Sequence, residues 1–451
     1  MKRAVGEPLP WVDPEDFFVT HAADRSRSFW LDGANARSWS GRRSYVGWLD
    51  DSEPSLTLDA GRGIVRQHDT SSSYDVGSDI FEVLAERTRS GDQSTRWVGY
   101  LGYAARRDLP ALVDQDPGAV PDACWLRAER WVEFDHVERT VRAVAAADAL
   151  ASWQERVALL VGGAVVAPGL PALPGIRTAR GIDEGEYAAA FSTVQEHLLR
   201  GNSYETNLTF QTAVESPASA LETYRRLRRV NPAPYAAYLH HLGTSVLSSS
   251  PERFVTIDTD RRIETRPIKG TTVRVADPAA DAAAAELLRT DGKFLGENLM
   301  IVDLLRNDLS RVCDVGTVQV TDLMHVESYA TVHQLVSTIE GRLRADVSTV
   351  DALKTIFPGG SMTGAPKERT MQIIAEVEAG PRGVYAGALG WVDADGSADL
   401  AIVIRTVVHH RGTYTFGTGG GLTVRSDLAA EYAEATWKAA RLLQALGATP
   451  P

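Results

Sequence analysis

The 451-residue chain is poor in lysine: six lysines stand among its 47 basic residues, and the rest are arginines. Arginine keeps its proton, whereas a lysine can act as a nucleophile or base once its pKa is lowered. One of the six, Lys269, lies in the segment "RPIKGT". Taken alone, that segment is most simply a solvated lysine in a Pro/Gly turn, so neighbouring motifs must decide its role.

Cysteine is also scarce, with Cys124 and Cys313 as the two examples. Two cysteines are too few for a disulfide framework, and these two lack the close spacing of a zinc site. Neither lies in the glycine-rich turn that carries a thiol nucleophile. We therefore expect two buried, inert thiols.

Long apolar runs are absent, and the N-terminal segment "MKRAVGEPLPWVDPED" lacks the apolar core of a signal peptide. These features predict a cytoplasmic protein without a membrane partner. The net charge of -12 argues against a nucleic-acid partner, because polyanion binding needs clustered cations. A small anionic ligand stays possible where cations are grouped.

A Pro- and Gly-rich segment over residues 165–181 is the clearest linker candidate. It predicts an N-terminal region over 1–165, rich in short strands, and a second domain over 180–447. Hairpin-sized gaps between the strands favour antiparallel pairing and an α+β fold. We expect helices over 183–200, 218–230, 278–310, 348–357, 367–378 and 427–446. We expect strands at "YETNLTFQTAV", "YAAYLHHL", "TSVLSSS", "RFVTIDT", "YAGALGWVD", "LAIVIRTVVHH" and "TYTFGTG".

Carboxylates stand in two apolar helical segments. Glu297 lies among leucines in 291–311, where its charge needs compensation. In the C-terminal segment, Glu431 and Glu434 are three residues apart and share a helix face, and Lys438 follows one turn later. If the helices pack, these oxygens suit Mg²⁺; the alternative for the second helix is an exposed Glu/Lys pair.

Two glycine-rich loops could bring backbone amides close to an anion. One contains Gly419, Gly420 and Gly421, and the other is "FPGGSMTGAPKER", in which Lys367 could face an anion. The first could equally be a hairpin turn. The second lacks the Gly-Lys-Ser/Thr of a Walker motif, which disfavours a nucleotide site.

Single polar residues complete the set. Arg405 ends an apolar strand, where either a carboxylate ligand or a structural salt bridge could neutralise it. Glu252 and His333 could supply protons, although a lone Glu or His is more often structural. Together these features suggest a small substrate with two carboxylates, one on Mg²⁺ and the other on arginine and backbone amides.

The motifs occur in the order found in a known family. They are "GNSYETNLT", "SSSPERF", "ETRPIKGT", "ENLMIVDLLRNDLSRV", "VESYATVHQLVSTIEG", "FPGGSMTGAPK", "AGALGWV", "AIVIRT" and "GTGGGLTVRSD". The chain resembles the chorismate-utilising enzymes, densely over residues 180–447. The resemblance implies large antiparallel sheets packed as a sandwich with helices on the outer faces.

Within that superfamily the "PIKGT" segment resembles component I of aminodeoxychorismate synthase, whereas anthranilate synthases usually read "PIAGT". The resemblance implies amination of chorismate by ammonia to 4-amino-4-deoxychorismate, en route to p-aminobenzoate and folate. Lys269 would attack C2 as a neutral amine, with loss of the C4 hydroxyl, and ammonia would then add at C4. Glu205 stands where water-activating relatives carry lysine, so that route is not supported.

The same resemblance assigns roles to the other residues. Glu252 would be the acid that assists departure of the hydroxyl, and His333 would lie near the enolpyruvyl side chain. Mg²⁺ ligands would be Glu297 and Glu434, with Glu431 close by. Substrate-binding residues would be Thr271, Ser361, Tyr385, Arg405, Gly419 and Lys438, and the neighbouring Gly420 and Gly421 belong to the same loop.

Two positions depart from the family pattern: Phe294 replaces a common acidic residue, which would weaken Mg²⁺ binding, and Trp437 replaces an asparagine. Ser44 and the "NPAPY" segment, with Pro234 and Tyr235, fit the region where tryptophan binds in relatives. Two alternatives to amination at C4 stay open. One is amination at C2, by an anthranilate synthase component I or a 2-amino-2-deoxyisochorismate synthase. The other is an inactive regulator that binds tryptophan.

Ammonia in this family comes from glutamine hydrolysis at a cysteine in a glycine-flanked turn. Neither cysteine here has that setting. We therefore expect the chain to use free ammonia or to receive it from a separate glutaminase subunit.

Overall fold

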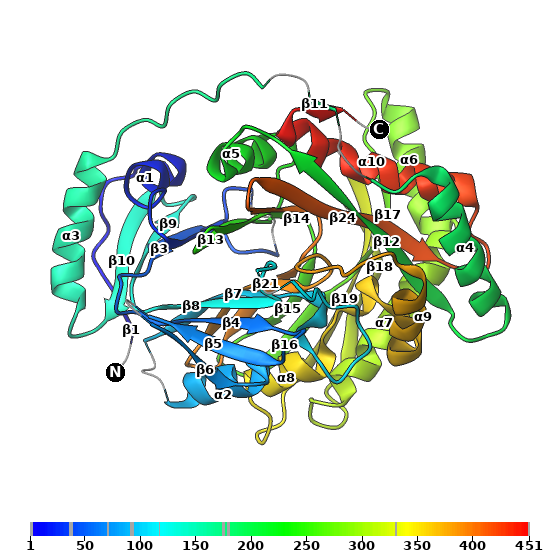
Figure 1. Cartoon of the computed structure of the whole chain (residues 1–451), viewed down its shortest axis with the longest axis horizontal. Coiled ribbons are helices and arrows are strands. Elements are labelled where there is room, and N and C mark those ends of the chain that lie inside the picture. The colour runs from blue at the N-terminus through cyan, green and yellow to red at the C-terminus, as the bar shows by residue number, and fades with distance from the viewer. Residues whose placement is uncertain are drawn as a thin grey trace.

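A computed structural model describes residues 3–35, 39–69, 72–90, 94–116, 118–173, 176–177, 181–329 and 332–449. Two large sheets face each other, and helices cover their outer faces (Figure 1). All pairings within these two sheets are antiparallel. The expected α+β sandwich is confirmed.

The first sheet joins both ends of the chain. Its strands, in spatial order, are β1 (Arg3–Val5), β10 (Thr140–Ala146), β9 (Trp131–Asp135), β3 (Arg43–Trp48), β2 (Arg27–Asp32), β13 (Tyr235–His241), β14 (Thr244–Ser250), β23 (Thr406–His410), β24 (Thr413–Leu422), β12 (Glu205–Glu215) and β20 (Gly364–Ala365).

The second sheet is built in the same way. Its strands, in spatial order, are β17 (Ile268–Val273), β19 (Val332–Arg342), β16 (Arg262–Arg266), β15 (Arg253–Ile257), β22 (Ala398–Ile402), β21 (Ala388–Asp393), β7 (Arg96–Leu101), β8 (Ala123–Ala128), β4 (Ser55–Asp59), β5 (Ile64–His68) and β6 (Ser73–Gly77), and β18 (Gln319–Ser328) also pairs with β19. A separate parallel pair joins β11 (Ile176–Arg177) to β25 (Ala448–Thr449).

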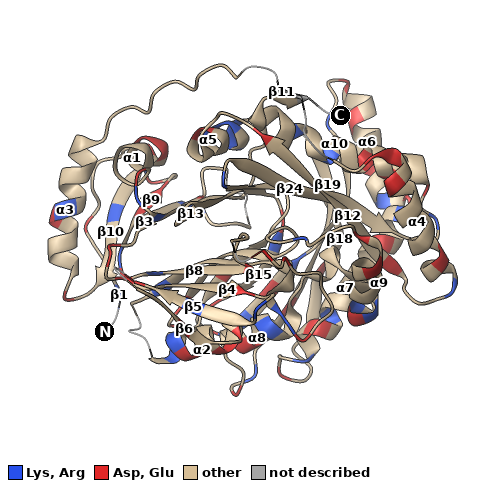
Figure 2. Cartoon of the chain, in the orientation of Figure 1, with Lys and Arg blue, Asp and Glu red and all other residues tan. Residues whose placement is uncertain are grey.

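Helices form the outer layers, with acidic and basic residues interspersed along them (Figure 2). They are α1 (Pro14–His21), α2 (Ile80–Ser90), α3 (Leu150–Gly163), α4 (Glu184–Leu199), α5 (Ala220–Val230), α6 (Pro278–Thr290), α7 (Gly292–Ser310), α8 (Thr349–Ile356), α9 (Lys367–Val377) and α10 (Leu428–Leu446), with short 3-10 turns at η1 (Tyr103–Ala105) and η2 (Gly360–Met362).

Three apolar clusters explain the layers. The middle cluster lies between the sheets and takes residues such as Phe29 and Leu239 from one sheet and Val98 and Leu389 from the other. Successive side chains of a strand point to opposite faces, so Tyr238 belongs instead to the cluster that packs α1, α3, α5 and α10 onto the first sheet. A third cluster packs α2, α7 and α8 onto the second sheet.

Both sheets contain strands from before and after residues 165–181. The N-terminal strands thus complete the sheets that the later strands begin. The division of the chain into regions 1–165 and 180–447 stays a prediction.

Two expected elements are each divided in the structure. The helix expected over 278–310 is broken at Asp291, whose carboxylate accepts hydrogen bonds from the backbone N–H groups of Lys293 and Phe294 and begins α7. The strand expected over 400–410 is two strands in different sheets. The chain crosses between them at Arg405, which has a left-handed φ of 51°.

Candidate active site

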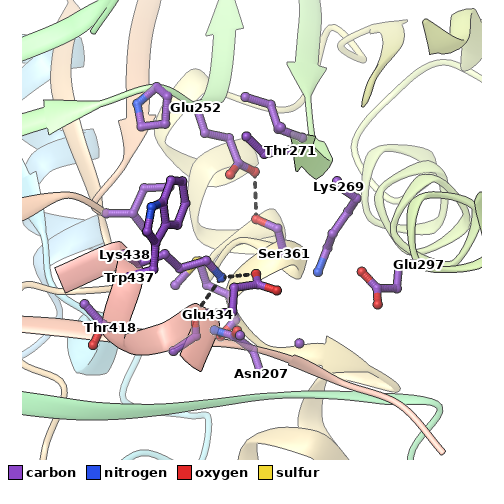
Figure 3. Close-up of a pocket in the computed structure, with 18 of the residues that line it drawn as sticks. Asn207, Glu252, Lys269, Thr271, Glu297, Ser361, Thr418, Glu434, Trp437 and Lys438 are labelled. Carbon is purple, nitrogen blue, oxygen red and sulfur yellow. Dashed lines mark hydrogen bonds and ion pairs between the residues drawn. The ribbon is translucent and has the colours of Figure 1, made fainter. Parts of the chain in front are cut away.

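A cavity of about 520 Å³ lies where the two sheets meet α7 and α10. It is lined by residues that are far apart in the sequence, as the close-up shows (Figure 3). Thirteen of the residues proposed from the sequence line it: Glu252, Lys269, Thr271, Glu297, Ser361, Tyr385, Arg405, Gly419, Gly420, Gly421, Glu431, Glu434 and Lys438.

Lys269 projects into the cavity from β17. The strand has an irregular register between Ile268 and Thr271, where Gly270 adopts a left-handed φ of 88°. A Cβ atom at Gly270 would lie 3.0 Å from the Phe294 ring, so this bulge needs glycine for both its backbone and its close packing. The bulge follows directly on the lysine and so helps to set its direction.

The Lys269 amine forms a buried ion pair with Glu205 of β12. Burial lowers the pKa of Lys269, but Glu205 and Glu297 outweigh this effect and raise the pKa overall. The structure thus pairs the amine with a carboxylate, and the neutral amine expected for the reaction stays a prediction. The second carboxylate oxygen of Glu205 is buried and has no hydrogen-bond partner among the described residues.

Glu252 also lines the cavity, and its carboxyl group is buried. The Ser361 hydroxyl donates to its carboxylate at 2.9 Å (Figure 3). Burial raises the pKa of Glu252 to about 7, although the Ser361 hydrogen bond and the Lys269 charge act in the other direction. This carboxyl group is thus suited to donate a proton to a leaving group.

Carboxylates from two helices meet around Lys293. Its amine donates to Glu431 at 2.9 Å and lies 3.9 Å from the carboxylate of Glu297. Burial raises the pKa of Glu297 to about 7. Glu431 is buried and also accepts from the Ser426 hydroxyl at 2.8 Å.

Glu434 and Lys438 face the cavity one turn apart on α10. The Lys438 amine donates to Glu434 at 2.8 Å and to the backbone oxygen of Gly419 at 2.9 Å (Figure 3). Despite burial, the charges of Lys438 and Lys293 lower the pKa of Glu434. Asp427 caps this helix, because its carboxylate accepts from the Ala430 N–H at 3.0 Å.

Arg405 and Tyr385 form a further wall. Arg405 donates to the backbone oxygen of Lys438 at 3.3 Å, and its guanidinium lies 5.6 Å from the centre of the Trp437 ring. Burial lowers the pKa of Arg405, as expected for a cation without a close carboxylate. Such an arginine is well suited to bind an anionic ligand.

The glycine run of β24 allows backbone and side chains to approach closely. A Cβ atom at Gly417 would lie 2.3 Å from the Tyr385 ring, and one at Gly421 would lie 2.2 Å from the Glu205 carboxylate. Side chains at these positions would displace the Tyr385 ring and the partner of Lys269. The run belongs to a paired strand, so a simple hairpin turn does not describe it.

His333 lies outside the cavity lining. It faces Thr272 in the strand register, whereas its neighbour Gln334 faces Thr271 and lines the cavity. The imidazole bonds to the Ser328 hydroxyl at 2.7 Å and the Asp281 carboxylate at 3.2 Å. The structure therefore does not bring the expected catalytic histidine to the other site residues.

The residues considered for tryptophan binding also lie away from the cavity lining. Ser44 is buried and bonds to Asp32 at 3.1 Å and His136 at 2.7 Å. The Tyr235 hydroxyl donates to Asp399 at 2.9 Å, and the adjacent Pro234 is buried. These side chains have partners within the chain, and tryptophan binding stays a prediction.

Three other residues from the sequence are placed as follows. Phe294 and Trp437 both line the cavity. Lys367 does not face an anion in the cavity, because its amine pairs with the buried carboxylate of Asp308 at 2.8 Å. Cys124 and Cys313 are free and buried, as expected.

The carboxylate oxygens are the donor type that Mg²⁺ prefers, and one oxygen of Glu297 is buried with no hydrogen-bond partner among the described residues. These residues fit the ion. In the described part of the chain, however, three acidic, histidine or cysteine side chains are nowhere gathered closely enough to hold a metal. These carboxylates form ion pairs with lysines: Glu431 and Glu297 with Lys293, and Glu434 with Lys438.

Sequence reasoning missed the partners that complete the site. The sequence showed that Glu205 stands where water-activating relatives carry a lysine. It did not show that Glu205 pairs with Lys269, because the two residues are 64 positions apart. Lys293 was missed too, although its spacing of four residues from Glu297 and the scarcity of lysine were available signals. Asn207 and Gln334 also line the cavity.

No helix among the described residues is long and apolar enough to cross a membrane.

Known proteins similar to the chain include enzymes of chorismate metabolism. It is 40% identical over 460 residues to "Aminodeoxychorismate synthase" of Streptomyces pristinaespiralis, covering 96% of this chain and 64% of that protein. The chain thus spans just under two thirds of that relative. It is 42% identical over 261 residues to "Aminodeoxychorismate synthase component 1" of Klebsiella aerogenes, covering 58% of each.

Among solved structures, anthranilate synthase component I from Streptococcus pneumoniae superposes with a TM-score of 0.77 at 27% identity, over 90% of this chain and 93% of that one. The chorismate binding enzyme family matches residues 27–444, across both sheets and every wall of the cavity. The chain belongs to the chorismate binding enzyme family.

Proposed function

We propose that the chain catalyses the amination of chorismate by ammonia, giving 4-amino-4-deoxychorismate. The observation that carries the proposal is the buried Lys269 amine in a cavity that also holds Glu252 and carboxylates from two helices. The similarity to two proteins named aminodeoxychorismate synthase supports it. The product would lead to p-aminobenzoate and folate.

Chorismate is a dianion, and the cavity offers separate partners for its carboxylates. Among the described residues, no carboxylate forms an ion pair with Arg405. Together with Tyr385, the Lys438 amine and the glycine run of β24, it would bind one of the substrate carboxylates. Thr271 and Ser361 would line the ring. The second carboxylate would face α7 and α10.

Glu297 and Glu434, with Glu431 nearby, would hold Mg²⁺ at that end. When bound, the ion would neutralise the facing carboxylate and fix its position. The residues of the chain would then hold the ring between Lys269 and Glu252, whose side chains lie on different walls (Figure 3).

The covalent step needs Lys269 to lose a proton. Its contacting partner is Glu205, so we assign the proton to that carboxylate. Nζ then bonds to C2, the two conjugated ring double bonds each shift by one position toward C4, and the C4–O bond breaks. Glu252 gives its proton to the departing hydroxyl, which leaves as water.

Ammonia next bonds to C4, both double bonds shift back, and the C2–Nζ bond breaks. The product carries the new ammonium group, and Glu205 returns its proton to the free Lys269 amine. Glu252 recovers a proton from the surrounding water. No oxidant or reductant is required.

The ammonia would be free in solution or come from a separate glutaminase subunit. Both cysteines are buried, and burial raises the pKa of Cys313 to about 11, which does not suit a thiolate nucleophile. The word "component" in the name of the Klebsiella relative supports a second subunit.

The test incubates the chain with chorismate, Mg²⁺ and an ammonium salt at mildly alkaline pH. The expected product has the mass of aminodeoxychorismate and yields p-aminobenzoate only after aminodeoxychorismate lyase is added. Fluorescent anthranilate without the lyase would instead indicate amination at C2, and absence of any turnover would favour the inactive regulator.

A further inference from the structure

Lys293 occupies the space between the carboxylates of α7 and α10. Its amine contacts Glu431 at 2.9 Å and lies 3.9 Å from Glu297. Among the described residues, it is the one cation within ion-pair distance of both carboxylates. It therefore supplies the positive charge that these buried groups need in the absence of a metal.

This lysine differs from Lys269 in its freedom to move. The side chain of Lys293 is 35% exposed, compared with 11% for Lys269. A lysine is a point charge on a flexible stem, so its amine can leave a carboxylate without disturbing the helix. One oxygen of Glu297 also lacks a hydrogen-bond partner among the described residues, so the lysine does not complete this group's bonding.

We propose that Lys293 is an internal counter-ion that competes with the divalent metal and must move out of the α7–α10 carboxylate site before the metal binds. The proposal rests on the proposed function, in which Glu297 and Glu434, with Glu431 nearby, would hold Mg²⁺. A divalent ion outcompetes the ammonium when the anionic substrate adds negative charge nearby. Lys293 thereby favours metal binding after, rather than before, chorismate binding.

The test measures Mn²⁺ binding to the ligand-free chain by electron paramagnetic resonance, with Mn²⁺ as a visible substitute for Mg²⁺. Lys293→Met should bind Mn²⁺ on the order of tenfold more tightly than the unaltered chain. This estimate lies between the weak effect of an exposed ion pair and the strong effect of a buried one. Lys293→Gln should also raise Mn²⁺ affinity, and it serves as the test variant if Lys293→Met does not fold.

Lys354→Met is the matched control. Lys354 also pairs with a carboxylate, Asp79, at 2.6 Å, and its side chain is 31% exposed, but it does not line the cavity. The control removes the same unit of charge, so it corrects for the general attraction between a more acidic protein and a cation. Its Mn²⁺ affinity should stay close to that of the unaltered chain.

A second measurement adds chorismate. The gain in Mn²⁺ affinity on adding chorismate should be large for the unaltered chain and smaller for Lys293→Met, because the competing amine is already absent. The counter-ion proposal would be overturned if both Lys293 variants bound Mn²⁺ no more tightly than the unaltered chain. It would also be overturned if Lys354→Met raised Mn²⁺ affinity as much as the Lys293 variants do.

If no chain binds Mn²⁺ even with chorismate, the metal site itself is wrong and the counter-ion fails with it. The product assay is separate from these binding measurements. It shows whether chorismate is aminated whatever the outcome for Lys293.

Discussion

Cations are held differently in the cavity and in the part of the sandwich where β7 meets β21. At β7, Arg96 bonds to both oxygens of Asp393 at 2.7 and 2.8 Å, and neither side chain is more than 6% exposed. In the cavity, Lys269 and Lys293 each donate to one carboxylate. The fixed fork of arginine suits permanent neutralisation, whereas a lysine amine can exchange its partner for a substrate or a metal.

The largest effect should follow from removing the cavity lysine that reacts. Lys269→Ala removes the nucleophile, so amination of chorismate should fall by at least about 10³-fold. Intact-mass measurement should detect a chorismate adduct on the unaltered chain when ammonia is withheld, and none on the variant. An undiminished adduct would mean that another residue attacks.

The arginine side of the comparison should show the opposite behaviour. Arg96→Met removes the arginine that pairs with both oxygens of the buried Asp393 carboxylate, and Arg3 stays as its ion-pair partner at 2.6 Å. Because a buried charge then loses one of its two cations, the free energy of unfolding should fall by about 3 kcal/mol. Urea denaturation measures this loss. Turnover per folded molecule should be unchanged, and a lower turnover at unchanged stability would remove the distinction between the two regions.

The third effect depends on pH and concerns Glu252. Burial raises its pKa to about 7, so the proton needed by the leaving hydroxyl is present below pH 7 and is lost as the pH rises. The rate of adduct formation should therefore fall about tenfold per pH unit well above that value. Rapid-quench measurements should show that Glu252→Gln lowers the rate about 10²-fold and removes this pH dependence. A pH dependence that persists in the variant would assign it to another group.

The fold could be predicted from the sequence where the signals are local. The helices expected over 427–446 and 183–200 match α10 and α4, and the side chains of Asp427 and Asp183 cap those helices in the structure. The crossing at Arg405 could not be predicted, because the apolar run "LAIVIRTVV" has no Pro or Gly where the chain changes sheets. That change is fixed by the partners of β22 and β23, which are distant in the sequence.

The site could be predicted as a set of residues, but not as a set of contacts. Motif resemblance brought together Lys269, Glu252 and Arg405, and all three line one cavity. It did not reveal that the lysine is paired with Glu205, because the pairing depends on how β12 and β17 are placed in different sheets. The register of β19 also turned His333 away from the cavity.

The smallest effect should follow from restoring a carboxylate at Phe294. This residue lies one turn before Glu297 and beside Lys293, and it lines the cavity. Phe294→Glu should tighten Mn²⁺ binding a few-fold. Removing a residue that orients a metal ligand typically changes metal affinity by roughly tenfold or more. The gain here should be smaller, because no neighbouring residue is in place to orient the new carboxylate. It also gives up the apolar contact of Phe294 beside Leu288 and Gly270.

Phe294→Gln separates the charge from the loss of the ring. If it tightens Mn²⁺ binding as much as Phe294→Glu does, access to the cavity rather than charge controls the metal. Combining Phe294→Glu with Lys293→Met should raise Mn²⁺ affinity by less than the sum of the two separate effects. The new carboxylate at position 294 can pair with Lys293, so part of the effect of Phe294→Glu comes from drawing that amine away from the metal site. A strictly additive result would show that Phe294 and Lys293 act on the carboxylates independently.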